Sequence, residues 1–171
     1  MNALLDGASE LTPDASPDDL KSSLEPFLMT VSPDLAQRWR GALYSLSPLN
    51  PDAARHFCTS AREIVATILD VRAPDNVVLS TLHGCELTQK GTPTRRAKIR
   101  YFLHRNGLAN VSLEGFIESD VENLVSLFKV FNQGTHGEAG AYNFAQLQAI
   151  RKRVEDGIAF LSEIVAPESQ R

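Results

Sequence analysis

Apolar residues recur at helical spacing along most of the chain, and this pattern predicts an all-α protein. Three similar helix-start signals, a capping residue followed by proline and aspartate, stand at residues 16–18, 32–34 and 50–52. Such triplets begin helices because the first side chain caps free N–H groups and the acid faces the positive end of the helix dipole. The helices that they predict end near Met29, before Pro48 and at Ala73.

The second half of the chain predicts three further helices. Their expected boundaries are Gly91–Thr94 to Asn106-Gly107, Asp120 to Gly134 after a linker over residues 108–119, and Asn143 to Pro167. Between the two halves, Val77–Leu79 is β-prone and Gly84 could form a turn, which leaves room for a short β-hairpin insertion near residues 76–88. We therefore expect a single bundle of about six helices.

Composition agrees with one globular domain. The chain has 171 residues, of which 43% are hydrophobic and 22% charged. We expect an acidic, flexible arm over residues 1–15, the helical domain over residues 16–166 and a tail over residues 167–171. No apolar run is long enough to span a membrane, and the acidic start does not resemble a signal peptide. With two cysteines and no disulfide framework, we expect a cytoplasmic protein.

Charge is distributed unevenly along the chain. The net charge of −4 excludes a globally basic nucleic-acid binder. Residues 1–34 nevertheless hold seven acids and one base, whereas residues 87–113 hold six bases and no acid. A local basic surface is therefore compatible with the overall acidity. A further hypothesis is that the acidic arm competes with a ligand for these cations.

The predicted helix after residue 52 carries a polar face with two arginines. Arg55, Thr59 and Arg62 share one side of that helix, and His56 and Glu63 lie on an adjacent strip. Guanidinium groups suit phosphate, and imidazole can transfer protons near neutral pH. The alternative is a solvated helix face with an internal arginine–carboxylate pair.

A second group of candidates lies in the segment from Asn132 to Gly137. His136 is flanked by small residues, and backbone N–H groups in such a segment can bind an anion. The alternative is a plain interhelical loop with a glycine stop. We take His136, Arg55, Arg62 and Asn132 as the candidate catalytic residues.

The basic segment is the third candidate. Its lysines and arginines, with Tyr101 and His104 among them, predict a surface that holds a nucleic-acid backbone. The candidate binding residues are Lys90, Arg95, Arg96, Lys98, Arg100 and Arg105. The alternative is that these cations pair with the protein's own acids. No nucleotide-binding loop, nucleophile elbow or metal-ligand spacing is present, so we expect no cofactor and no metal.

Several of these motifs together resemble a known family. The stretches NPDAARHFCTSAREIV, GTPTRRAKIRYF and FNQGTHGEAG, with the step Ala73-Pro74-Asp75, look like predicted pPIWI-associating nucleases of bacterial conflict systems. The resemblance covers roughly residues 35–165. It implies a nucleic-acid-directed defence component and a partner protein from the same system.

The helical layout also resembles HEPN-like domains, many of which are metal-independent ribonucleases that act as homodimers. Their motif has an arginine, a polar residue such as asparagine, and a histidine a few residues later. Asn132 and His136 match this motif, but Phe131 stands in place of the arginine. Three interpretations follow: a nuclease, a non-catalytic binding module, and an adaptor or antitoxin-like protein whose basic helix the acidic arm or a partner masks.

Overall fold

The computed structural model describes residues 24–107, 114–140 and 142–165. Within these ranges the chain forms helices and no strand, so the all-α prediction is confirmed. The helices are α1 (Glu25–Val31), α2 (Pro33–Ser45), α3 (Ala53–Arg72), α4 (Asp75–Thr81), α5 (Arg95–Arg105), α6 (Glu114–His136) and α7 (Phe144–Val165). The predicted arm and tail, and the start signal at residues 16–18, lie outside the described residues.

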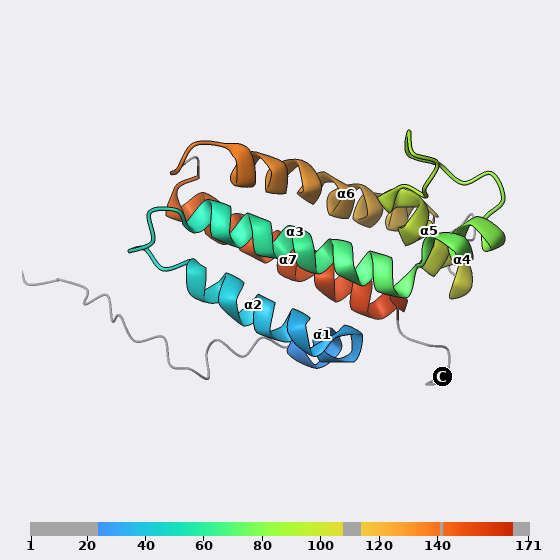
Figure 1. The fold of residues 1–171 in the computed structure, drawn as a ribbon, viewed down its shortest axis with the longest axis horizontal. Helices are drawn as coiled ribbons and strands as arrows, with labels where there is room; N and C mark the ends of the chain where they lie inside the picture. The colour runs from blue at the N-terminus through green and yellow to red at the C-terminus, as the bar shows by residue number, and fades with distance from the viewer. Residues whose placement is uncertain (1–23, 108–113, 141, 166–171) are drawn as a thin grey trace, which may run out of the picture.

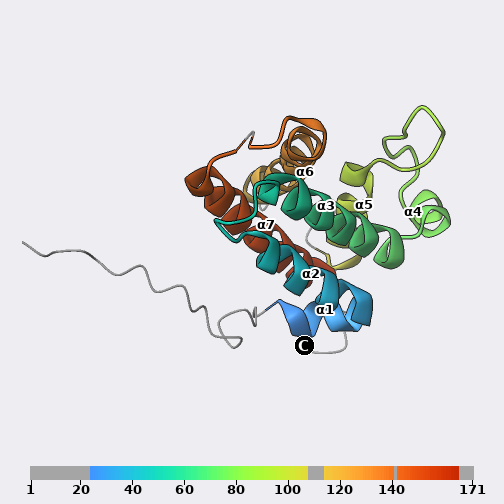
Figure 2. The ribbon, with the colours of Figure 1, turned by 60° about the vertical axis from the view of Figure 1, so that its left-hand side comes forward.

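Helix α3 is the centre of the bundle. It packs against α2, α6 and α7, and Figures 1 and 2 show it with α6 on one side, α2 on the other and α7 behind. Helices α4 and α5 lie at the end of the bundle where α3 finishes (Figure 1). The largest fully buried side chains include Trp39, Phe57, Phe102 and Phe131, which come from four different helices. One continuous core therefore fixes the helices around α3.

The capping signals at Ser32, Thr94 and Asn143 have the expected structural effect, whereas the signal at residues 50–52 is followed by an N-cap at Asp52 that makes no side-chain cap bond. The Ser32 hydroxyl accepts a hydrogen bond from the backbone N–H of Asp34, and the Thr94 hydroxyl accepts one from Ala97 at 3.2 Å. At the start of α7, Asn143 and Gln146 bond each other's backbone N–H groups with side-chain oxygens, both at 2.9 Å. These bonds satisfy donors that a helix start leaves free.

The expected β-hairpin insertion is wrong. Residues 75–81 form α4, which raises the number of described helices to seven. Proline at position 74 precedes this helix, Asp75 is in its first turn, and Val78 is fully buried. Burial of one valine against the core outweighs the weak β-preference of the segment. A single isolated bridge between Leu87 and Pro93 is the remaining β-like feature of the described chain.

Helix α6 also differs from its predicted boundaries. It begins at Glu114, so Asp120 lies inside the helix rather than at its cap, and it continues past Gly134 to His136. Gly134 does not end the helix. A Cβ atom at this position would overlap Sγ of Cys58 on α3 and lie 2.8 Å from Cβ of Cys58. The glycine therefore allows close approach of the two helices.

In the parts of the chain that the structure describes, no helix is long and apolar enough to cross a membrane.

We predict that Gly134→Ala lowers the free energy of unfolding by about 1–3 kcal/mol, because the added methyl overpacks the contact with Cys58. Gly41→Ala in α2 is the matched control. A Cβ there meets nothing within 4 Å, so this change should stabilise the protein by about 0.5–1 kcal/mol. Chemical denaturation measures both. The double variant Gly134→Ala/Cys58→Ala should regain part of the loss, and a Gly134→Ala protein as stable as wild type would contradict the packing role.

Candidate functional site

The first turns of α3 lie beside the last turn of α6. Arg55 Nη2 donates a hydrogen bond to the carbonyl oxygen of Gly137 at 3.2 Å. One turn further along α3, the hydroxyl oxygens of Thr59 and Thr135 are 3.3 Å apart. The two helices therefore run in opposite directions here, and the Arg55 guanidinium reaches the residue that follows His136.

A shallow hollow of about 600 Å³ lies at this end of α6. It is lined by Asn132, Gln133, His136, Gly137 and Tyr142. Asn132 and His136 are exposed, and the Tyr142 hydroxyl donates to Oε1 of Gln133 at 3.1 Å. The hollow is open to a large ligand, and its histidine and amide groups can both reach such a ligand.

Two nearby groups are poorly suited to react with a ligand in the hollow, as a nucleophile or as a proton acceptor. Burial raises the pKa of the Cys58 thiol to about 11, so Cys58 stays neutral and is a poor nucleophile at neutral pH. His56 Nδ1 lies 3.1 Å from the Asn50 amide nitrogen, and its Nε2 lies 3.8 Å from Asp52. Since that amide nitrogen only donates, His56 Nδ1 accepts and the ring is held in place. His136 is therefore the better placed histidine for a ligand in the hollow.

A line of cations continues from the hollow along the junction of α3 and α6. Arg62 lies about 10 Å from Arg55 along the axis of α3, and it bonds Oε1 of Glu63 at 3.1 Å. Beyond it, the guanidinium of Arg95 on α5 stacks on the Phe128 ring of α6, 3.9 Å from its centroid. Burial lowers the pKa of Arg95, and the neighbouring charge of Arg62 lowers it further against the opposite effect of Asp70.

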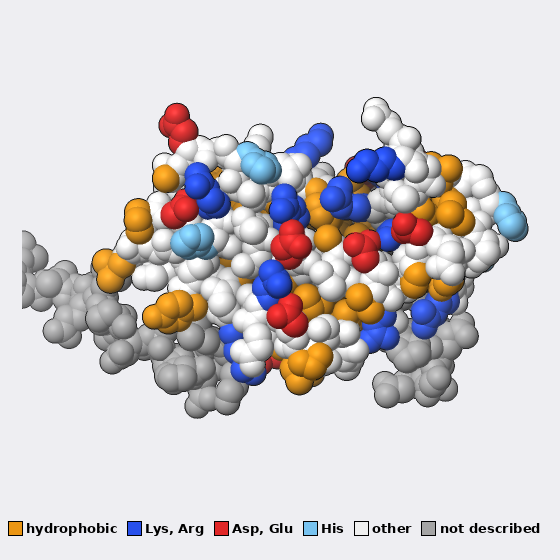
Figure 3. Space-filling model, viewed as in Figure 1, with side chains coloured by type: hydrophobic (Ala, Val, Ile, Leu, Met, Phe, Trp, Pro, Cys, Tyr) orange, Lys and Arg blue, Asp and Glu red, His pale blue; other side chains and the backbone are white. Residues whose placement is uncertain are grey.

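We call Arg55, His136, Arg62 and Arg95 the α3–α6 strip. Figure 3 shows Lys and Arg side chains in a broken row over these helices, with histidines toward both ends of the molecule. Asn132 and His136 line the hollow, and Arg55 bonds Gly137 at its edge, whereas Arg62 lies further along the strip. In the described residues, no group of three His, Cys, Asp or Glu side chains could hold a metal ion.

A family model for predicted pPIWI-associating nucleases matches residues 28–161, which is most of the chain. The chain belongs to this family. The resemblance that the motifs indicated is thereby confirmed. No curated protein and no solved structure matched the chain.

In this member of the predicted pPIWI-associating nucleases, the position before Asn132 is part of the core. Phe131 is fully buried and makes an edge-on contact with Phe128, with ring centroids 5.7 Å apart. An arginine at this position would bury a charge without a partner. Arg55 from α3 supplies a guanidinium at the same end of α6 instead.

The basic segment of this family member is divided between an internal and an exposed part. Lys98 is 6% exposed, and its Nζ lies 2.6 Å from Asp70 Oδ1 on α3 and 2.8 Å from Asp75 Oδ1 on α4. Arg96 pairs with Glu122 on α6. For Lys98 and Arg96, the alternative interpretation holds: these cations pair with the protein's own acids, which belong to the helical bundle. Lys90 and Arg100 are exposed, and Arg105 is half-buried.

The sequence did not indicate the partners of Lys98 or the stack on Phe128. Asp70 and Asp75 lie on either side of Pro74 in the sequence, 28 and 23 positions before Lys98. In the sequence, Phe128 is one of the apolar residues at helical spacing between Asp120 and Gly134. Only the packing of α5 against α3 and α6 brings these groups together, and no local spacing signals it.

We predict that Lys98→Met destabilises the protein by roughly 1 kcal/mol at neutral pH, because two charge-assisted hydrogen bonds between α3, α4 and α5 are lost. Burial lowers the pKa of Lys98, but the bonds and charges of Asp70 and Asp75 outweigh it, so the pKa is raised above 10.5. The folded state then holds this proton more tightly than the unfolded state. The stabilisation is present below pH 10.5 and is lost as the pH rises through the folded pKa.

Denaturation of wild type and Lys98→Met across pH 7–11 measures the difference. Lys152→Met, which removes an exposed lysine bonded to Asp156, is the control and should change stability much less. A difference that stays constant above pH 10.5 would show that the charge of Lys98 is not its cause.

Proposed function

We propose that this protein is a nucleic-acid-directed component of a bacterial defence system and that it cleaves a phosphodiester bond at the hollow of the α3–α6 strip. The family description supports a nuclease associated with pPIWI. The observation that carries the proposal is the hydrogen bond from Arg55 to the carbonyl of Gly137, the residue that follows His136. We place the protein in the cytoplasm, with a pPIWI-type partner protein and a second copy of the chain as candidate partners.

The chemistry that suits these groups is metal-independent cleavage of RNA. His136 takes the proton of a ribose 2′-hydroxyl, the 2′-oxygen forms a bond to phosphorus, and the bond from phosphorus to the 5′-oxygen breaks. The leaving oxygen takes a proton from solvent. Arg55 stabilises the charge that develops on the phosphate oxygens, and the Asn132 amide donates to the same group. Arg62 contacts the next part of the backbone.

The lysines and arginines of the basic segment have unequal roles in this proposal. Arg95 is exposed and continues the strip, so it contacts the backbone directly. Lys90, Arg100 and Arg105 add positive charge around it. Lys98 and Arg96 are bonded to carboxylates, and we assign them to holding α5 in place.

The alternative is a non-catalytic module or adaptor that binds nucleic acid at the same strip. The burial of Phe131 favours it, because this chain lacks the arginine that HEPN-like ribonucleases place before the asparagine. This module would bind with strong salt dependence and leave the strand intact.

We predict that His136→Ala lowers the cleavage rate of single-stranded RNA about 10²–10⁴-fold and leaves its affinity within a few-fold of wild type. The reason is that the change removes the proton acceptor and no backbone contact. Gel analysis of end-labelled RNA, with EDTA present, measures the rate. His83→Ala, which alters an exposed histidine outside the strip, is purified in parallel and should cleave normally. Equal cleavage by wild type and His136→Ala would remove this mechanism, and intact RNA with wild type would favour the binding module.

We also predict that Arg55→Ala and Arg62→Ala each make the dependence of log affinity on log salt shallower by about 1, because each removes one phosphate contact. Fluorescence anisotropy with RNA across a salt series measures the slope. Arg153→Ala removes the same charge from an exposed position on α7 and should leave the slope unchanged. If all three variants behave alike, the strip is not the binding surface.

A further inference from the structure

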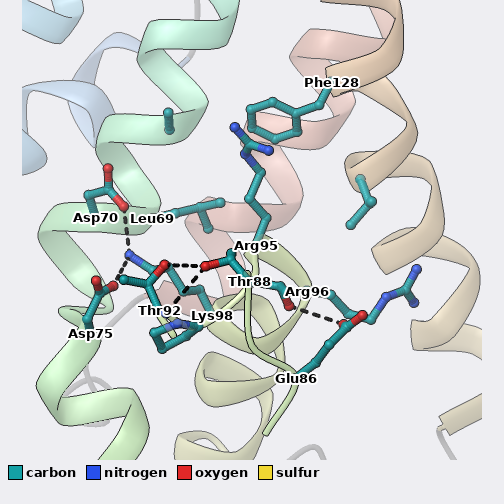
Figure 4. A pocket seen from close by; sticks show the side chains of 14 residues that line it. Leu69, Asp70, Asp75, Glu86, Thr88, Thr92, Arg95, Arg96, Lys98 and Phe128 are labelled. Carbon is teal, nitrogen blue, oxygen red and sulfur yellow. Dashed lines mark hydrogen bonds and ion pairs between the residues drawn. The ribbon is translucent and has the colours of Figure 1, made fainter. Parts of the chain in front are cut away.

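A pocket of about 510 Å³ lies at the far end of the α3–α6 strip from His136. Leu69 of α3 and Phe128 of α6 form two of its sides, and the segment from residue 86 to residue 94 crosses between them. Figure 4 shows Arg95 pointing across this space toward Phe128, with Thr88 and Thr92 near the middle. Its volume suits one small ligand rather than several units of a polymer.

One turn of the chain forms part of the pocket's lining. Thr88, Thr92, Pro93 and Thr94 form part of its lining. These residues belong to one turn, in which the Thr88 backbone N–H donates to the Thr92 carbonyl at 2.7 Å. A strand that follows the strip from the hollow reaches the pocket at Arg95, and this turn lies beside it there.

The cations that line the pocket differ in what they already bind. Lys98 bonds Asp70 and Asp75, and Arg96 bonds Glu122. Within the described chain, no carboxylate lies within ion-pair distance of Arg95, whose guanidinium rests on Phe128. One face of this guanidinium is covered and its N–H edges stay accessible. Burial lowers the pKa of Arg95, the charge of Asp70 raises it and the charge of Arg62 lowers it.

The remaining lining is suited to the uncharged part of a nucleotide. The hydroxyls of Thr88 and Thr92 are 2.8 Å apart. One oxygen of the Glu86 carboxylate accepts from Thr94 at 3.1 Å, which leaves its other oxygen for a donor such as a ribose hydroxyl or a base amino group. Anion-binding and acceptor groups therefore face each other across a pocket of nucleotide size.

We propose that this pocket binds a terminal phosphate monoester on a nucleoside, with Arg95 as its cation. The inference rests on the proposed function, because it makes the pocket the anchor for one end of the strand that the strip holds. A terminal phosphate carries more charge than an internal diester and can enter a pocket through which a strand cannot pass. The same chemistry occurs in a strand end and in a free nucleoside monophosphate.

The test is binding of short single-stranded RNA to full-length His136→Ala protein, so that no cleavage occurs. The probes carry a 5′-phosphate, a 3′-phosphate or hydroxyls at both ends, and each competes with a labelled reference RNA. One of the phosphorylated ends should bind about tenfold more tightly than the hydroxyl form. Adding Arg95→Met should remove this preference, since methionine still covers Phe128 but carries no charge. Adding Arg153→Met instead should retain it.

Each outcome has a defined meaning. Thermal unfolding first confirms that the Arg95→Met protein is folded. If it is not, Arg95→Lys is used in its place. Lysine keeps the charge but cannot form a bidentate bond, so this variant should retain only part of the preference. Equal affinity for all ends, or a preference that Arg95→Met leaves intact, overturns the pocket proposal and leaves the strip proposal standing. Absence of any RNA binding overturns both. A free nucleoside monophosphate that binds as tightly as the phosphorylated RNA supports the pocket and identifies the free nucleotide as its ligand.

Discussion

The close contact between α3 and α6 is the constraint on which the rest of the structure depends. Gly134 has no side chain where α6 meets Cys58, so the two helices approach closely enough for Arg55 to bond the carbonyl after His136. A larger residue at position 134 would move the last turn of α6 away from α3. The candidate site is therefore a consequence of helix packing, because its guanidinium and its imidazole come from positions 81 residues apart.

A second contact orders the other end of the same surface. Lys98 joins α5 to both α3 and α4 through two carboxylates, and this position of α5 brings Arg95 over Phe128. Cations that are neighbours in the sequence thus have different functions. Lys98 forms ion pairs within the protein, whereas Arg95 keeps accessible N–H groups and extends the strip that begins at Arg55. Our proposal that this strip binds nucleic acid is consistent with membership of the predicted pPIWI-associating nucleases.

The sequence predicts those features that depend on local chemistry. Capping by Ser32, Thr94 and Asn143 and the apolar stripes of α3 and α7 follow from propensity and periodicity, and the structure confirms them. Gly134 was misread because a glycine near a helix end also fits a stop, and only the position of Cys58 distinguishes the two roles. Helix α4 was missed because the burial of Val78 is a tertiary effect. The separation of Arg62 from His136 depends on the antiparallel register of α3 and α6, which no motif encodes.

The central claim is that nucleic acid binds along the α3–α6 strip, from Arg55 and His136 to Arg62. Nuclear magnetic resonance of the full chain, titrated with a 2′-O-methyl RNA that cannot be cleaved, tests it most directly. The imidazole resonances of His136 and the Nε–Hε resonances of Arg55 and Arg62 should shift together along one binding curve, while those of His83 stay fixed. RNA that binds and shifts His83 or His104 but leaves His136 and Arg55 unchanged would contradict the account.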